Sequence, residues 1–314
     1  MLCQAAGQSG PTIAIPNYPL KDTFFAPGQV VTLQVTGLKT VLPAPVHANI
    51  VPLPLVLSGI SVKVNQYSRL GVSPTPTLIS SVAAPLFSIV QSNRCFNQTA
   101  ATADCMVTSI TLQLPFESLA DPPLNSISPH QTELAIVENG VSGKGFGIYQ
   151  TLASVHIVTG CGQFDSPCVT HADGSVVSQR SPAIAGEEVV IYALGLGYTA
   201  PKVATGEVTP APAPTAAAPV YALFNFGPNA GPIPIPNTVD PGAPAATYVP
   251  DFVGLTPGQV GLYQINLKIP ATIPAIPACG GTGPYSQVAS NLTITIGSIY
   301  MTSDAAPICV APPK

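Results

Sequence analysis

The sequence predicts an all-β protein made of two copies of one sandwich domain, and three observations support this. Proline accounts for 37 of the 314 residues, more than double its usual share of about 5%. Because proline lacks a backbone N–H and breaks helix interiors, few stretches remain in which a long helix could form. The runs between the prolines are short, rich in β-branched residues and alternately apolar and polar, which is typical of strands. The third observation is an internal repeat.

The repeat consists of three segments that recur in the same order, about 155 to 158 residues further along the chain. The paired segments are 26–38 with 184–196, 110–115 with 265–270, and 133–137 with 291–295. In the first pair, two glycines lie nine positions apart in both copies, as Gly28 and Gly37 and again as Gly186 and Gly195. A shared order and offset over three segments indicate two copies of one domain.

Residues 1–23 are expected to form an extended leader, strand-like from Thr12 to Pro16 but interrupted by prolines. The first domain is expected to span 24–160 and to open with a turn at Ala26–Gly28. Its expected strands are 29–35, 60–64, 86–90, 107–114, 133–137 and a final strand within 146–157. Strands at such intervals, separated by turn residues, favour a sandwich over alternating strands and helices.

The second domain is expected to span 161–314. Asp173-Gly174 lies between two apolar runs and predicts a hairpin there. The further expected strands are 188–194, 220–226, 260–269 and 288–296. A Pro-rich insertion, residues 209–250, contains eleven prolines and is expected to run as polyproline II or irregular loops on the surface. Because so long a loop usually has a function, the insertion is the best candidate for a binding surface, with a solvated spacer as the alternative.

Motifs in the second domain resemble a known bacterial module. They are Ser181–Glu187, Leu194–Gly197, the block Gly254–Asn266 with its Gly-Leu-Tyr-Gln-Ile-Asn run, Ile269-Pro270 and Ser290-Asn291. Together they resemble the uncharacterised C-terminal domain abundant in Acidobacteria of the Solibacter type, which is similar in turn to the IPT/TIG fold. The resemblance covers 181–300 and reaches the first domain only through the repeat. It implies export and immunoglobulin-like β-sandwiches in tandem, but no established activity and no catalytic residues.

The seven cysteines indicate an oxidising compartment. Two pairs bracket short loops, and a third pair flanks the last expected strand, so that a bond there would tie the C-terminal tail to the sandwich. The predicted disulfides are Cys95–Cys105, Cys161–Cys168 and Cys279–Cys309, which leaves Cys3 without a partner. Paired cysteines in a Pro-rich, Lys-poor β-protein predict secretion or display at the cell surface.

Zinc is the rival interpretation of Cys161 and Cys168, because His156 and His171 lie near them in the sequence. Structural zinc usually takes cysteines separated by two to four residues, and this gap is longer, so no metal is predicted.

Two groups of ionisable residues are weighed as sites and set aside. His171, Asp173 and Asp165 suggest calcium or acid–base chemistry, but they lack a run of regularly spaced oxygen ligands. Glu187 and Glu188 are adjacent in an expected strand, where successive side chains point to opposite faces and the two carboxylates are unable to cooperate.

Several function classes are disfavoured. The net charge is −4 and the ten Lys and Arg residues are scattered singly, so no basic patch is expected for nucleic acid. The most apolar stretch, Val41–Ile60, holds four prolines and is not expected to span a membrane as a helix. The sequence has neither a Gly-x-Ser-x-Gly motif nor a Gly-rich phosphate loop. We expect no enzyme activity, no catalytic residues and no cofactor.

The leading hypothesis is a secreted or cell-surface structural or adhesive protein. In its sharper form the protein is a filament subunit, whose leader around Thr12–Leu20 adds a strand to the open sheet edge of another copy. The alternative is an extracellular module that binds a glycan or a protein through the surface of residues 209–250.

Overall fold

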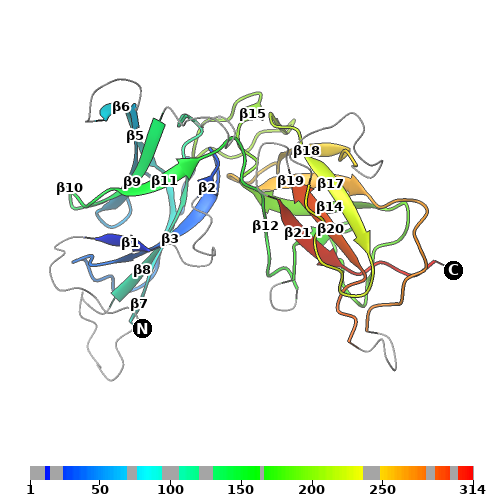
Figure 1. The fold of residues 1–314 in the computed structure, drawn as a ribbon. Coiled ribbons are helices and arrows are strands. Elements are labelled where there is room, and N and C mark those ends of the chain that lie inside the picture. Colours follow the sequence, from blue (N-terminus) through cyan, green and yellow to red (C-terminus); the bar gives the residue numbers. More distant parts are fainter. Residues whose placement is uncertain are drawn as a thin grey trace. The chain divides into compact units, whose positions relative to one another are not determined.

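The chain is built from strands (Figure 1). The computed structural model describes residues 11–14, 24–68, 76–93, 106–119, 130–162, 166–235, 248–280, 287–297 and 303–313. None of these residues forms an α-helix, so this part of the chain holds no helix long and apolar enough to cross a membrane. The prediction of an all-β fold is confirmed. The chain divides into two units, residues 1–150 with 204–208 and residues 151–203 with 209–314.

The first unit contains two sheets. One has the strand order β1 (Thr12–Ala14), β3 (Val30–Thr36), β8 (Met106–Gln113), β7 (Leu86–Asn93) and β4 (Val46–His47). The other has the order β2 (Phe24–Phe25), β11 (Phe146–Gln150), β9 (His130–Glu138), β5 (Ile60–Ser68) and β6 (Thr77–Ala84), with β10 (Val141–Ser142) beside β9. The order β1-β3-β8-β7 corresponds to strands A, B, E and D of immunoglobulin-type sandwiches, and β5, β9 and β11 of the other sheet correspond to strands C, F and G.

One hydrophobic core joins these two sheets. Along β3 the residues are alternately half-buried and buried, and along β5 every second residue from Ile60 to Gln66 is buried, as expected for strands with one face turned inward. The inward side chains of both sheets form a single cluster that includes Leu33, Ile110, Val62 and Leu134. The first unit is therefore a β-sandwich.

The second unit repeats this plan. Its larger sheet has the order β12 (His156–Ile157), β14 (Glu188–Leu194), β19 (Tyr263–Lys268), β18 (Phe252–Leu255), β16 (Thr215–Ala216) and β15 (Thr199–Ala200), with β13 (Val169–Thr170) beside β14. Its smaller sheet has the order β17 (Tyr221–Phe226), β20 (Leu292–Gly297) and β21 (Asp304–Ile308). A sheet of four main strands, β12-β14-β19-β18, and a sheet of three form the immunoglobulin pattern once more.

The repeat seen in the sequence is reproduced in the pairing register. Leu33 of β3 lies opposite Ile110 of β8, and the equivalent residues of the second unit, Ile191 of β14 and Ile265 of β19, also lie opposite each other. The third repeated segment forms β9 in one unit and β20 in the other, each in the sheet that does not contain this pair. The three segments thus occupy equivalent strands in the two units.

The repeated glycines bracket the second sandwich strand of each unit. Their φ angles are positive, 76° at Gly28, 80° at Gly37, 81° at Gly186 and 78° at Gly195. Only glycine adopts this conformation without steric cost, which explains why the same residue recurs at both ends of the strand.

The boundary between the units differs from the predicted one. It lies between Gln150 and Thr151 rather than at Cys161, because His156–Ile157 pairs with β14 of the second unit. The expected final strand within 146–157 is therefore two strands, one in each unit. Residues 204–208 belong to the first unit, where the Gly206 N–H donates to Gln113 Oε1 over 2.7 Å.

The two equivalent glycines Gly28 and Gly186 make a matched test of local packing. A Cβ added at Gly28 would overlap the ring of Phe116, whereas at Gly186 its nearest contact would be 3.9 Å away, at Ala271. We expect Gly186→Ala to lower the free energy of unfolding by about 1–2 kcal/mol through its positive φ alone. Gly28→Ala should cost about 2–5 kcal/mol, because the ring must also move. Urea unfolding followed by circular dichroism measures both; equal losses would contradict this account.

Candidate functional site

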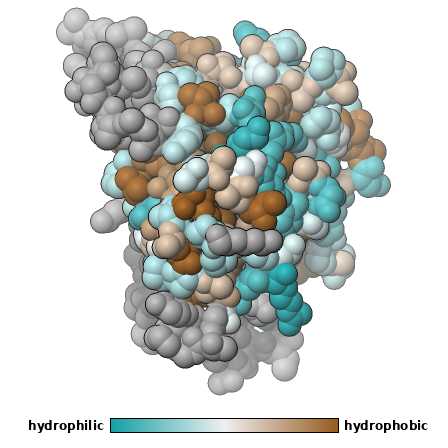
Figure 2. Space-filling model, turned by 90° about the vertical axis from the view of Figure 1, so that its right-hand side faces the viewer, coloured by the Kyte–Doolittle hydropathy of each residue, from teal (hydrophilic) through white to brown (hydrophobic). Residues whose placement is uncertain are grey.

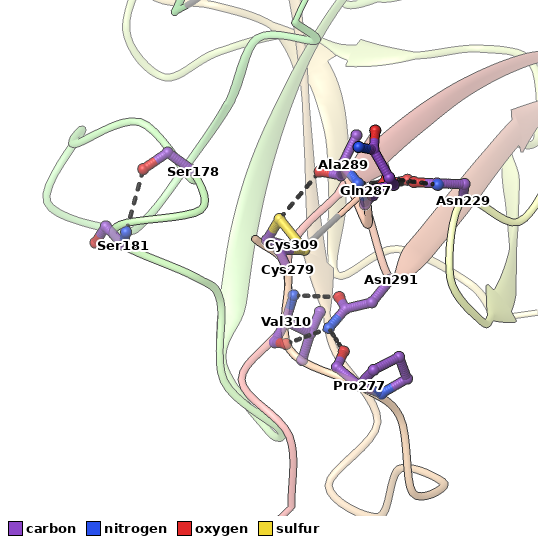
Figure 3. The surroundings of a disulfide bond; sticks show 11 residues. Ser178, Ser181, Asn229, Pro277, Cys279, Gln287, Ala289, Asn291, Cys309 and Val310 are labelled. Carbon is purple, nitrogen blue, oxygen red and sulfur yellow. Dashed lines mark hydrogen bonds between the residues drawn. A yellow bond between two sulfur atoms is a disulfide. The ribbon is translucent and has the colours of Figure 1, made fainter. Parts of the chain in front are cut away.

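A disulfide and a buried asparagine hold the C-terminal tail of the second unit (Figure 3). Cys279, in the loop after β19, is bonded to Cys309, which directly follows β21. Asn291 is completely buried beside them. Its side-chain amide donates to the carbonyl oxygens of Pro277 and Val310, each over 2.8 Å, and its Oδ1 accepts from the Val310 N–H over 2.7 Å. We call these five residues the C-terminal clasp.

The tail is also bonded on its other side. The Ala183 N–H donates to the Cys309 carbonyl over 2.9 Å, and the Ala311 N–H donates to the Ala183 carbonyl over 2.7 Å. Val310 thus lies between Asn291 and a parallel bridge to Ala183. Every polar group named here has a partner inside the protein, so the clasp stabilises this end of the second unit.

Cys161 and Cys168 form the second disulfide of the described residues. Two sulfurs bonded to each other are not available as thiolate ligands, and His156 and His171 have protein partners of their own, Ser154 and Glu187. Cys95, Cys105 and Cys3 lie outside the described residues, so the third predicted disulfide stays a prediction. Among the described residues no group of three or more His, Cys, Asp or Glu side chains is placed to hold a metal ion.

His171, Glu187 and Ser181 form a polar cluster at the end of the Asp173-Gly174 hairpin. His171 Nδ1 lies 2.5 Å from Glu187 Oε1. His171 Nε2 lies 3.2 Å from the Ser181 hydroxyl and 3.1 Å from the Ser181 carbonyl oxygen. In space the histidine lies between a serine hydroxyl and a carboxylate, as in a hydrolytic triad.

The contacts of His171 favour its protonated form. A carbonyl oxygen only accepts, so the contact with the Ser181 carbonyl is a hydrogen bond when Nε2 carries a proton, and the contact with the Glu187 carboxylate is one when Nδ1 carries a proton. Desolvation lowers the pKa of His171, but hydrogen bonds to Glu187 and Ser181 and the nearby carboxylates of Glu187 and Asp173 outweigh it, and the pKa is raised above 6.5. The cluster holds two loops together.

The carboxylates of the other candidate residues accept hydrogen bonds from neighbouring groups of the protein. Glu187 Oε2 accepts from the Ile184 N–H over 2.8 Å, whereas Glu188 Oε1 accepts from Asn266 over 3.3 Å. The two adjacent carboxylates thus have different partners. Asp173 Oδ1 accepts from the backbone N–H and the hydroxyl of Ser175, which shapes the hairpin turn. Asp165 lies outside the described residues.

The Pro-rich insertion is not simply a surface loop. Thr215–Ala216 forms β16, which pairs with β15 and β18. Residues 227–235 cover the outward face of β17 and β20: Thr293 donates to the Ala230 carbonyl over 2.6 Å, and Thr295 accepts from the Ile233 N–H over 3.1 Å. This cover explains why every residue of β20 is buried although it lies in a three-stranded sheet.

Three aromatic side chains of the insertion are grouped at the edge of that sheet. Phe224 contacts Tyr248 edge-on at 4.6 Å between ring centroids and stacks on Phe226 at 6.2 Å. Tyr248 also exchanges two backbone hydrogen bonds with Ala222 and covers part of the β17 edge. Tyr248 and the neighbouring Val249 are exposed, at 39% and 72%. On the face shown in Figure 2, hydrophobic residues form several separate patches among hydrophilic ones.

Comparison with protein-family models finds no match, and comparison with curated proteins finds none either. The resemblance to the acidobacterial domain therefore stays a prediction based on the motifs.

Removing the Asn291 amide should weaken the C-terminal clasp. Asn291→Ala leaves the buried carbonyl and N–H of Val310 and the carbonyl of half-buried Pro277 without this partner, so we expect a loss of about 3 kcal/mol in the free energy of unfolding. The matched control is Asn266→Ala in β19, whose half-buried amide bonds Glu188 and should contribute about 1 kcal/mol or less. Chemical denaturation of both variants decides the point. A loss at position 291 no larger than at position 266 would show that the amide is dispensable.

The His171–Glu187 pair should make stability depend on pH. Because the folded pKa of His171 is raised, its contribution is complete below the unfolded value of about 6.5 and is lost as pH rises through the folded value. We expect His171→Gln to lose more stability relative to wild type at about pH 5.5 than at about pH 8.5. Urea unfolding at both pH values measures this. Glu187→Gln should show the same pattern, and the reverse trend would refute the assignment.

Proposed function

We propose that the protein is a secreted or cell-surface structural element without enzymatic activity, which acts in adhesion or assembly. The observation that carries this proposal is the clasp: a disulfide and a fully satisfied buried amide secure the chain end. A bond that closes a loop of 30 residues contributes about 3.6 kcal/mol in the chain-entropy model. Such bonds persist in oxidising compartments, which supports a place outside the cytoplasm.

The sharper proposal is self-assembly through the N-terminal strand. Thr12–Ala14 pairs with Val30–Thr36 at the edge of the sheet, with Ile13 opposite Val35, and Ile13 is only 5% exposed. The same three residues can make the same bonds to β3 of another copy, as in domain swapping. If each copy gives its strand to the next, the contact is head-to-tail, and repetition produces a filament.

Deleting residues 1–22 tests this proposal. The shortened chain keeps nearly all of the first core, so it should stay folded, but it lacks the exchanged strand and should no longer form polymers. Electron microscopy and size-exclusion chromatography of both proteins provide the measurement, with circular dichroism to check folding. Polymers formed equally by the deleted chain would remove this mechanism.

The alternative function is an extracellular module that binds a glycan or a protein through the 209–250 surface. The specific observation in its favour is the partly exposed group of Phe224, Phe226 and Tyr248, since aromatic rings supply much of the contact area in such sites. This alternative needs no self-association, so a protein that stays monomeric at high concentration while binding a glycan or protein would favour it.

A further inference from the structure

Strand β6 forms a sheet edge of the first unit that none of the described residues covers with a further strand. It is eight residues long, Thr77–Ala84, and pairs with β5 on one side only. None of the described residues pairs with its other side. A strand at the edge of a sheet presents a row of unpaired N–H and C=O groups to whatever strand approaches it.

The other edge strands of the described sheets are short or protected. Strands β1, β2, β4, β12 and β15 have only two or three residues each. Strand β21 carries Asp304 and Pro307, and the β17 edge is partly covered by Tyr248. Charge, proline, short length and cover are the usual ways to prevent edge-to-edge pairing. β6 has none of these four protections, although its pairing with β5 shifts register between Gln66 and Tyr67, which leaves Ile79 as the extra residue of a β-bulge.

The composition of β6 favours association with a like strand. Residues 76–93 contain no charged side chain, and the only prolines, Pro76 and Pro85, lie outside the strand. Leu78 and Ile79 are exposed by 53% and 46%. An uncharged strand with exposed aliphatic side chains has neither repulsion nor loss of charge hydration to overcome on pairing.

We propose that β6 pairs antiparallel with β6 of a second copy of this chain. A twofold axis perpendicular to the sheet keeps the inward face of each copy inward, so the two sheets continue as one. The cation of this sheet nearest to β6 is Lys63, which lies on β5 opposite Ala83 of β6. Its counterpart in the second copy lies three strand spacings away, about 14 Å, which exceeds the screening length of about 8 Å at physiological salt.

This contact is distinct from the proposed exchange of β1. It uses the other sheet of the first unit and is symmetric, whereas exchange of β1 is head-to-tail. A chain that makes both contacts would form cross-linked filaments, and a chain that makes only the β6 contact would form dimers.

The test compares the full chain with Ile79→Lys, which places two like charges on the pairing edge. The matched control is Val141→Lys in β10, an apolar residue that is 72% exposed on the same sheet. In analytical ultracentrifugation we expect wild type and Val141→Lys to form dimers or larger species, and Ile79→Lys to weaken the β6 contact about twofold to fivefold, because it adds like charge to both strands of the pair. Deuterium exchange of wild type should show residues 77–84 gaining protection as concentration rises.

The chain without residues 1–22 separates the two proposals. If it still dimerises and Ile79→Lys weakens that dimer, the β6 contact is supported, whether or not the full chain forms filaments through β1. A wild type that is monomeric at every concentration, an Ile79→Lys protein that associates like wild type, or association without protection of residues 77–84 would each overturn the β6 contact. The last two results would leave exchange of β1 intact.

Discussion

The fold depends on one strand pairing, made once in each unit: β3 with β8, and β14 with β19. The buried residues of these strands alternate with half-buried ones, so a shift of one residue would turn the core side chains to the outward face of the sheet. Positive-φ glycines end the first strand of each pair and so fix where the pairing starts and stops. The other strands add to a register that this pair has already determined.

The two units share this strand pairing but hold their loops in place by different interactions. The first uses a buried polar network in which the Gln66 amide donates to Gln150, Thr132 and the Leu119 carbonyl. The second uses the C-terminal clasp. Both rely on side-chain amides, which suits a chain with only 8% charged residues. A buried amide with all its bonds made holds loops in place without the desolvation cost of an ion pair.

The sequence predicted the fold class, the repeat and the strands of its three segments, because alternation and proline spacing are local signals. It missed β6, β18 and β21, which depend on tertiary partners. Cysteine spacing identified both disulfides of the described residues. The sequence placed Asn291 only in the Ser290-Asn291 motif and in the expected strand 288–296; its three bonds join residues far apart in sequence, and no local pattern reveals them. No local pattern reveals the contact between Ser181 and His171 either, because the hairpin between these two residues brings them together.

Low charge has a consequence for solubility and for association. Globular proteins commonly keep sheet edges apart by placing lysine there, and this chain has ten Lys and Arg residues in total. It protects its edges instead with short strands, Pro307 and the cover provided by residues 227–235 and Tyr248. Each of these features prevents a strand from pairing at one edge by its shape, and none of them adds charge to the surface. Where the described residues leave an edge uncovered, as at β6, no charge within residues 76–93 opposes pairing, which is why we place the proposed self-association there.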